Sequence, residues 1–82
     1  AIERIGNFWW LGTTGGLIRY DTMDKSIMLF NRGNSELPGD YVNDLTVDDN
    51  GKLWVATKNG LARYEYENGR QFSVFSQYTG SL

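Results

Sequence analysis

An internal repeat is the feature of this 82-residue chain that most restricts its fold. One segment, Trp10–Tyr20, reads WLGTTGGLIRY, and a second, Trp54–Tyr64, reads WVATKNGLARY, so the copies are offset by 44 residues (54 − 10). Further along, Phe30 falls opposite Phe75 at an offset of 45. The identical pairs are Trp10/Trp54, Thr13/Thr57, Gly16/Gly60, Leu17/Leu61, Arg19/Arg63 and Tyr20/Tyr64. The period excludes no repeat class by itself, but no segment keeps apolar residues at helical spacing over three turns, which excludes helical repeats.

Each copy divides into four short strand-forming segments separated by turn sequences. In the first copy the predicted strands are Ile2–Ile5, Phe8–Thr13, Leu17–Asp21 and Ser26–Phe30. In the second copy they are Tyr41–Val47, Lys52–Thr57, Leu61–Tyr66 and Arg70–Ser76. The tetrapeptide Asp48-Asp49-Asn50-Gly51 has the composition of a hairpin turn, and the polar segment Asn31–Asp40 would carry the chain between the copies. Four strands in roughly 40–50 residues are typical of a β-propeller blade.

We therefore predict an all-β chain of two four-stranded antiparallel blades, residues 1–37 and 38–82, the first with an incomplete inner strand. The central segments Phe8–Leu11 and Leu53–Ala56 are apolar on both faces, which indicates strands that are covered on both faces. A propeller achieves this by packing each blade between two neighbours, and closure takes roughly 4–8 blades. We thus expect the partners of this chain to be the remaining blades of a longer propeller, or further copies of itself.

Composition narrows the classes of function. The net charge is −2 without a basic stripe, which argues against nucleic acid as a partner, and no apolar stretch reaches the roughly 18 residues of a membrane span. The chain has no Cys and no His, and so lacks the commonest general base and metal ligand. We expect no cofactor and no bound metal.

The repeats resemble a known family. The stretches DDNGKLWVATKNGLARYEY and IGNFWWLGTTGGLIRYD are similar to the two-component regulator propeller repeat. The first copy departs from the pattern at Arg4-Ile5-Gly6-Asn7, where an acidic pair would stand. Matching positions are Asp48, Asp49, Gly51, Leu53, Trp54, Thr57, Gly60, Leu61, Arg63 and Tyr64 in the second copy, and Trp10, Gly12, Thr13, Gly16, Leu17, Arg19, Tyr20 and Asp21 in the first.

The resemblance implies more than the residues do. Such repeats form the extracytoplasmic sensor regions of hybrid histidine kinases and related signalling proteins, often in gut bacteria that sense oligosaccharides. A periplasmic or extracellular location follows from the resemblance. Because Leu82 falls opposite Leu37 and Ala1 opposite Leu45, the equivalents of residues 38–44 are missing at the junction, so we expect a fragment of a larger propeller.

Residues shared by both copies are interpreted as structural, because a feature needed in every blade serves the blade. On this basis Trp10 and Trp54 pack between blades, and Arg19 and Arg63 make structural hydrogen bonds or stack. Glu65 and Glu67 share a strand face about 7 Å apart, near a glycosidase spacing, but they lie on a third strand, far from a central channel. We interpret them as a solvated acidic face and predict no catalytic residues.

Ligand contacts are predicted where the copies differ and loops are exposed. A tyrosine with amide, carboxylate and guanidinium groups nearby suits stacking on, and hydrogen bonding to, a sugar. The predicted ligand-binding residues are Arg32, Asn34, Tyr41, Asn43 and Asp44. The alternative is that Asn31–Asp40 is a solvated crossover and nothing more.

Three functions remain open from the sequence. The first is a non-catalytic module of an extracytoplasmic sensor, binding carbohydrate or acting as an interaction scaffold. The second is a piece of a propeller enzyme, a glycoside hydrolase or a lyase. The third is a lectin-like propeller that several copies close by association.

Overall fold

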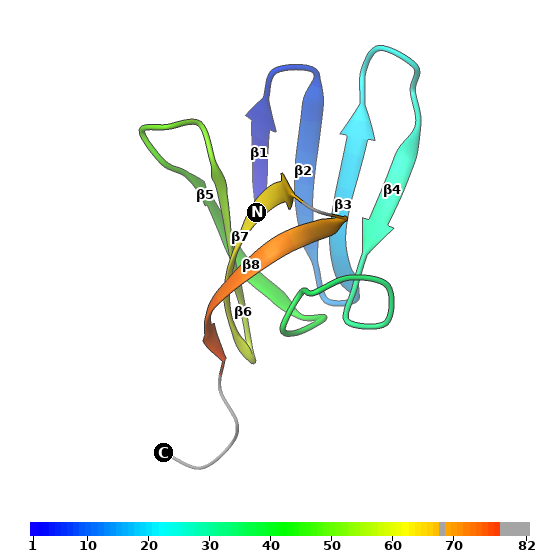
Figure 1. The fold of residues 1–82 in the computed structure, drawn as a ribbon. Helices are drawn as coiled ribbons and strands as arrows, with labels where there is room; N and C mark the ends of the chain where they lie inside the picture. The colour runs from blue at the N-terminus through cyan, green and yellow to red at the C-terminus, as the bar shows by residue number, and fades with distance from the viewer. Residues whose placement is uncertain (68, 78–82) are drawn as a thin grey trace.

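Two antiparallel sheets make up the computed structural model, which describes residues 1–67 and 69–77. The strands are β1 (Ile2–Ile5), β2 (Phe8–Thr13), β3 (Gly16–Asp21), β4 (Ile27–Phe30), β5 (Val42–Val47), β6 (Leu53–Thr57), β7 (Gly60–Glu67) and β8 (Arg70–Gln77) (Figure 1). Each sheet contains four strands in chain order, β1 to β4 and β5 to β8. This architecture confirms the predicted fold class, and strand ends differ from the prediction by at most one residue.

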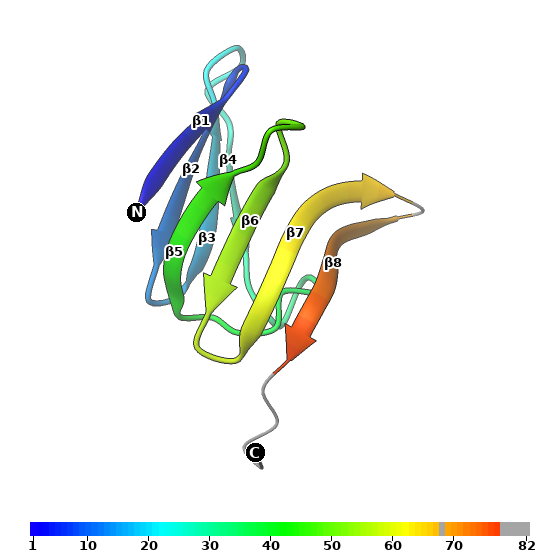
Figure 2. The same cartoon turned by 90° about the vertical axis from the view of Figure 1, so that its left-hand side faces the viewer.

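The sheets stack with their first strands adjacent. Strand β5 lies against both β1 and β2, and Figure 2 shows the second sheet in front of the first. Strand β1 spans four residues where β5 spans six. Within the described part of the chain there is no helix, and hence none that would cross a membrane.

The first hairpin forms without the acidic pair of the family pattern. Strands β1 and β2 end on the pair Ile5 and Phe8, so Gly6-Asn7 is a two-residue turn. Gly6 has φ +59° at the first central position, where a type II′ turn requires glycine. The second copy turns differently: the Asp48 amide donates to the Lys52 carbonyl (2.9 Å) and the Gly51 amide to the Asp48 carbonyl (3.0 Å), closing a three-residue loop.

The repeated threonine organises the turn between the second and third strands of each sheet. The Thr13 hydroxyl donates to the Gly16 carbonyl (2.8 Å) and accepts from the Gly15 amide (3.1 Å). Thr57 bonds the Gly60 carbonyl and the Asn59 amide at the same distances. One threonine thus satisfies two backbone groups in each turn, which explains its presence in both copies.

The hydrophobic core lies between the sheets. The Trp10 indole is 2% exposed and stands 4.6 Å from the Tyr64 ring, centroid to centroid. Phe30 packs at 5.5 Å from Phe72 and 5.9 Å from Tyr64. Buried residues of this core are Trp10, Leu17, Phe30, Leu37, Val42, Leu45, Leu53, Val55, Ala62 and Phe72. First-sheet residues therefore meet second-sheet residues face to face, as neighbouring blades do.

The crossover between the sheets is fastened to the second sheet. A carboxylate oxygen of Glu36 accepts from the Gln71 amide (2.7 Å) and the Phe72 amide (3.0 Å) of β8. Leu37 is buried, and a Cβ added at Gly39 would lie 2.8 Å from the Thr57 hydroxyl. The interpretation of this segment as a solvated crossover therefore fails over residues 36–39, which pack on β8 and on the turn between β6 and β7.

Candidate functional site

The five predicted ligand-binding residues have different surroundings in the structure. Asn34 is taken up by its own loop: its side-chain amide donates to the Leu29 carbonyl (2.7 Å), and its side-chain oxygen accepts from the Asn31 amide (2.9 Å). Its role in the structure is to shape the loop after β4. The side chain of Asn34 is thus committed within the fold.

Arg32 and Tyr41 lie at the two ends of the crossover, which Asp40 links. The Asp40 carboxylate accepts from the Arg32 amide (2.8 Å), which joins the start of the crossover to its end. The Tyr41 side chain is 40% exposed, and its carbonyl accepts from the Lys58 amide (3.1 Å). The Lys58 ammonium lies 4.2 Å from the centroid of the Tyr41 ring, a cation–π contact. We call Arg32, Tyr41 and Lys58 the crossover patch.

Asn43 and Asp44 stand at an irregularity of β5. The register between β5 and β6 shifts between Val42 and Asp44, so Asn43 is the extra residue of a β-bulge. Both side chains are exposed. Asp44 accepts from the Leu45 amide (2.9 Å) and borders a shallow groove on the side of the second sheet away from the first. Bulges re-aim side chains near binding sites, which is consistent with a role for Asn43.

Sequence reasoning missed Lys58 as a member of the patch. A signal for it existed, because Lys58 falls opposite Thr14 at the repeat offset of 44 and so differs between the copies. The predicted residues lie in the crossover and at the start of the strand that follows it, whereas Lys58 lies in the turn between β6 and β7. Lys58 is therefore the added functional candidate.

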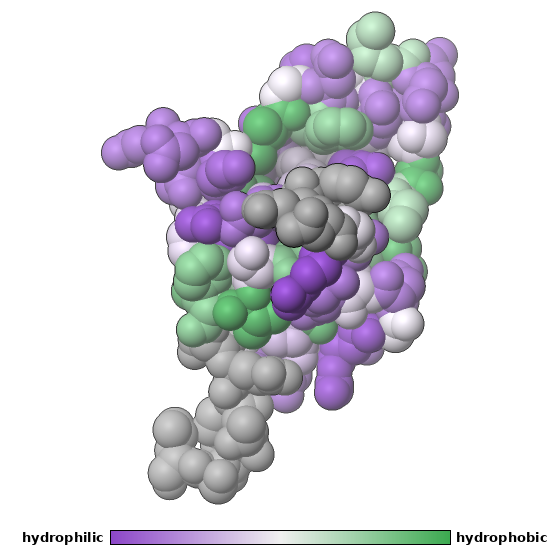
Figure 3. Space-filling view, viewed as in Figure 1, coloured by the Kyte–Doolittle hydropathy of each residue, from purple (hydrophilic) through white to green (hydrophobic). Residues whose placement is uncertain are grey.

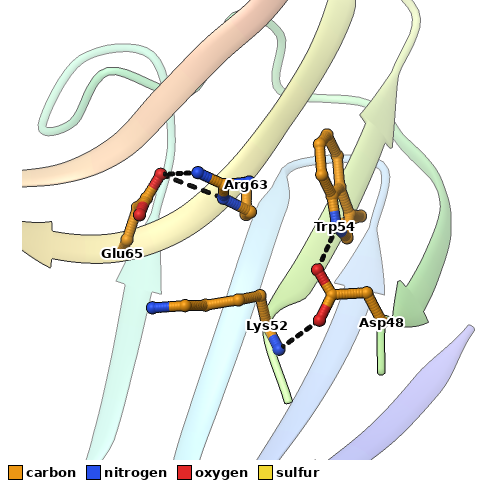
Figure 4. A network of polar contacts seen from close by, with 5 residues as sticks. All are labelled: Asp48, Lys52, Trp54, Arg63 and Glu65. Atoms are coloured by element: carbon orange, nitrogen blue, oxygen red, sulfur yellow. Dashed lines mark hydrogen bonds and ion pairs between the residues drawn. The ribbon is translucent and has the colours of Figure 1, made fainter. Parts of the chain in front are cut away.

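Five residues of the second copy form a polar network on one side of the second sheet (Figure 4). The Trp54 indole donates to Asp48 (2.8 Å), whose other oxygen accepts from the Lys52 amide (2.9 Å). The guanidinium of Arg63 donates to Glu65 through Nε (2.9 Å) and Nη2 (2.5 Å). Hydrogen bonds from the Lys52 amide and the Trp54 indole lower the pKa of Asp48.

The candidate glycosidase pair is not arranged for acid catalysis. Hydrogen bonds from Arg63 and from Ser73 lower the pKa of Glu65, whereas a general acid needs a raised pKa. The side chain of Glu67 lies outside the described residues. Among the side chains that are described, no three of the metal-ligating types come together. The arrangement of Glu65 is that of a structural ion pair.

A second candidate binding site lies near the β1–β2 turn, at the end of the sheets opposite to the crossover patch. It is a cleft of about 240 Å³ between the two sheets, lined by Ile5, Phe8, Trp10, Gly51, Lys52, Leu53, Tyr64 and Glu65. Aromatic rings form much of its wall. Its residues are mainly those of the packing core, so the cleft is a margin of the interface between the sheets.

Two four-stranded antiparallel sheets, stacked face to face with their first strands adjacent, define the chain as a pair of blades from a β-propeller. Residues 36–59 match the family model described as the two component regulator propeller. This segment covers the end of the crossover, β5 and β6. The resemblance to this repeat is thereby confirmed for the second copy.

Two solved structures are similar over most of the chain. Both are the extracellular domain of BT4673 from B. thetaiotaomicron. The one described as a one component system has a TM-score of 0.80 and 27% identity over 89% of this chain. The other, described as a hybrid two component system, has a TM-score of 0.83 and 26% identity over 98% of this chain. The present chain spans 10% and 11% of the length of these structures. A search of curated proteins found no match.

Proposed function

We propose that this chain is part of the propeller of an extracytoplasmic signalling sensor, and that it binds a carbohydrate without catalysing a reaction. The observation that carries the proposal is the fold similarity, over 89% and 98% of this chain, to extracellular domains of a signalling protein. A periplasmic or extracellular location of this chain is part of the same proposal.

Binding, rather than catalysis, is favoured by the state of the carboxylates. Glu65 is held by Arg63, Glu36 by two amides of β8, and Asp48 by Trp54 and two turn amides. Each of these groups has its pKa lowered, so each is an ionised, hydrogen-bonded part of the fold. None of the three is poised to donate a proton at neutral pH.

The crossover patch is the proposed carbohydrate contact. An exposed tyrosine ring offers an apolar face for the C–H surface of a sugar, and the exposed side chains of Arg32 and Lys58 would supply donors for its hydroxyls. The patch lies where a blade enters the next one, and propeller loops of this kind carry the variable chemistry. Asn43 and Asp44, exposed at the bulge that follows, would extend the contact along β5.

Titration of the isotopically labelled 82-residue chain with neutral and acidic oligosaccharides, followed by amide NMR shifts, tests the binding. We expect shifts at Tyr41 and Lys58 that saturate with one sugar class and disappear in Tyr41→Ala. Met23→Ala is the matched control, since Met23 is 75% exposed in the turn between β3 and β4. No shift with any sugar, or shifts confined to the cleft at the β1–β2 end, would overturn the assignment of this patch.

The coding sequence on either side of residues 1–82 tests the sensor part of the proposal. We expect further repeats of the same pattern, followed by a membrane span and a kinase or DNA-binding domain. A pair of acidic catalytic residues in the adjoining repeats would instead favour a propeller enzyme.

A further inference from the structure

The outward side of the second sheet repeats the surface by which the first sheet packs on the second. We call Trp54, Ala56, Leu61, Arg63 and Phe75 the outer face. The Arg63 guanidinium lies 5.2 Å from the Trp54 ring centroid and 4.7 Å from that of Phe75. In the first sheet the equivalent guanidinium, that of Arg19, lies near the equivalent rings, 5.9 Å from Trp10 and 5.4 Å from Phe30. The same aromatic and cationic cluster is therefore built twice.

The two clusters differ in how far their aromatic side chains are buried. Trp10 and Phe30 are each 2% exposed, because the second sheet lies over them. Phe75, at the position of Phe30, is 51% exposed, and Trp54 is only half-buried. Apolar residues reach the surface on this side of the molecule (green, lower left in Figure 3). The outer face is an interface cluster without its covering sheet among the described residues.

A groove marks where a covering sheet would insert. It measures about 60 Å³ and is lined by Asp44, Leu45, Thr46, Trp54, Ala56 and Leu61. At the equivalent place on the first sheet stands Gly12, and there the second sheet enters: a Cβ added to Gly12 would lie 2.6 Å from Val42 Cγ1 and 3.7 Å from Leu45 Cγ. The first strand of one blade thus fits against the second strand of the blade before it.

Arg63 of the outer face contacts Glu65 through only one side of its guanidinium group. Arg19 donates through Nη1 to the Tyr64 hydroxyl (2.9 Å) across the interface. Arg63 contacts Glu65 through Nε and Nη2, so Nη1, the atom that Arg19 uses, is on the other side of the guanidinium. Asp21 stands at the position of Glu65 but accepts from the Met23 amide. The ion pair therefore orients Arg63 without replacing the contact that Arg19 makes.

We propose that the outer face binds a further four-stranded blade of the same repeat, which presents a tyrosine hydroxyl to Nη1 of Arg63 and, against Ala56, a first-strand residue smaller than valine. The size limit follows because Ala56 carries the Cβ that Gly12 lacks, and a valine placed as Val42 is would clash with it. The proposal rests on the propeller assignment, and it names the chemistry of the neighbour rather than its ligand.

An extended chain tests the proposal. A second copy of residues 38–77 is appended after Leu82, which falls opposite Leu37, so the repeat continues in register. In the appended copy Trp54→Phe removes its own fluorescence signal. The remaining fluorescence comes from Trp9, Trp10 and Trp54. We expect acrylamide quenching of this fluorescence to fall below that of the 82-residue chain as Trp54 becomes covered, and the urea midpoint to rise above that of the 82-residue chain.

Two substitutions in the appended copy make the test specific. Val42→Ala in the appended copy should raise the urea midpoint further, because that residue would face Ala56. The same change in the original copy should lower the midpoint, because the original Val42 faces Gly12. Ala56→Gly in the original copy should raise the urea midpoint when the appended copy carries Val42. The same substitution should have no such effect when the appended copy carries Val42→Ala. Tyr64→Phe in the appended copy should lower the midpoint.

Two results would overturn the proposal: quenching of the tryptophan fluorescence that is unchanged by the extension, or equal effects of Val42→Ala in the two copies. Neither result bears on sugar binding, which is read at Tyr41 and Lys58 in the original chain. Conversely, loss of sugar binding in Tyr41→Ala leaves the docking measurements unaffected, so the two proposals fail separately.

Discussion

Arg19, on the third strand of the first sheet, donates a 2.9 Å hydrogen bond to the hydroxyl of Tyr64, on the third strand of the second sheet. Both residues belong to the repeated Arg-Tyr pair, and each copy contributes a different member to the contact. The arginine points forward to the next blade and the tyrosine points back to the previous one, because adjacent strand residues face opposite sides. Each repeat thus supplies residues that contact the neighbouring blade as well as residues that form its own sheet.

Removal of the Tyr64 hydroxyl should weaken this connection without disturbing the aromatic packing. We expect Tyr64→Phe to lower the free energy of unfolding by about 1.5–3 kcal/mol, the range for hydrogen bonds to charged groups, toward the lower end because the contact is partly exposed. Urea unfolding followed by fluorescence measures the change. Tyr20→Phe is the matched control on the outward side of the first sheet, and an equal loss there would contradict the role of the Arg19 contact.

The two repeated tryptophans should differ in their effect on stability. Trp10→Ala removes a residue that is 2% exposed, at a cost of about 3–5 kcal/mol, which a domain of this size cannot absorb, so the variant should be unfolded by circular dichroism. Trp54→Ala removes a half-buried ring from the uncovered outer face and should leave a cooperative urea transition. If both variants unfold alike, Trp54 is as well covered as Trp10.

Gly12 should tolerate no side chain. An alanine Cβ at this position would lie 2.6 Å from Val42 Cγ1, so Gly12→Ala should destabilise the chain by about 1–3 kcal/mol through overpacking. The double variant Gly12→Ala with Val42→Ala should lose less free energy of unfolding than the two single variants lose when their losses are added. Strict additivity in a double-mutant cycle would show that β2 and β5 do not meet at this point.

Glu36 should give the chain a pH-dependent component of stability. Burial raises the pKa of Glu36, but hydrogen bonds from the amides of Phe72 and Gln71, together with the charge of Arg70, lower it, so the net pKa lies below the ordinary value of 4.5. A lowered folded-state pKa contributes stability that is present above the unfolded value and is lost as pH falls through the folded value. The stability difference between the natural chain and Glu36→Gln should therefore be constant above pH 4.5 and shrink below it. A difference that is flat down to the acid transition would show that the two amide bonds are absent.

Much of the fold was predictable because the repeat and the turn residues are local signals. Strand ends came within one residue, since Gly, Asn and Asp interrupt each strand-forming segment. What could not be predicted is which faces meet: the stacking of the sheets brings Trp10 against Tyr64, a contact that depends on the angle between blades. The local pattern also did not show that the side-chain amide of Asn34 donates a hydrogen bond to the Leu29 carbonyl.

The candidate site was less predictable than the fold for the same reason. Tyr41 and Arg32 were found by composition, but Lys58 joins them only because the turn between β6 and β7 folds next to the crossover. Such proximity between segments is set by tertiary structure and leaves no mark in local spacing. A comparison of the copies shows only that Lys58 and Asn59 of this turn replace Thr14 and Gly15.

The central claim is that the two sheets are neighbouring blades joined through Trp10 and Tyr64. Nuclear Overhauser effects between the side-chain protons of these two rings test it most directly. With centroids 4.6 Å apart, strong cross-peaks are expected between the Trp10 indole and the Tyr64 ring, and none between Trp54 and Tyr20 within one molecule. Absence of the Trp10–Tyr64 cross-peaks in the folded chain would contradict the stacking of the sheets and the account built on it.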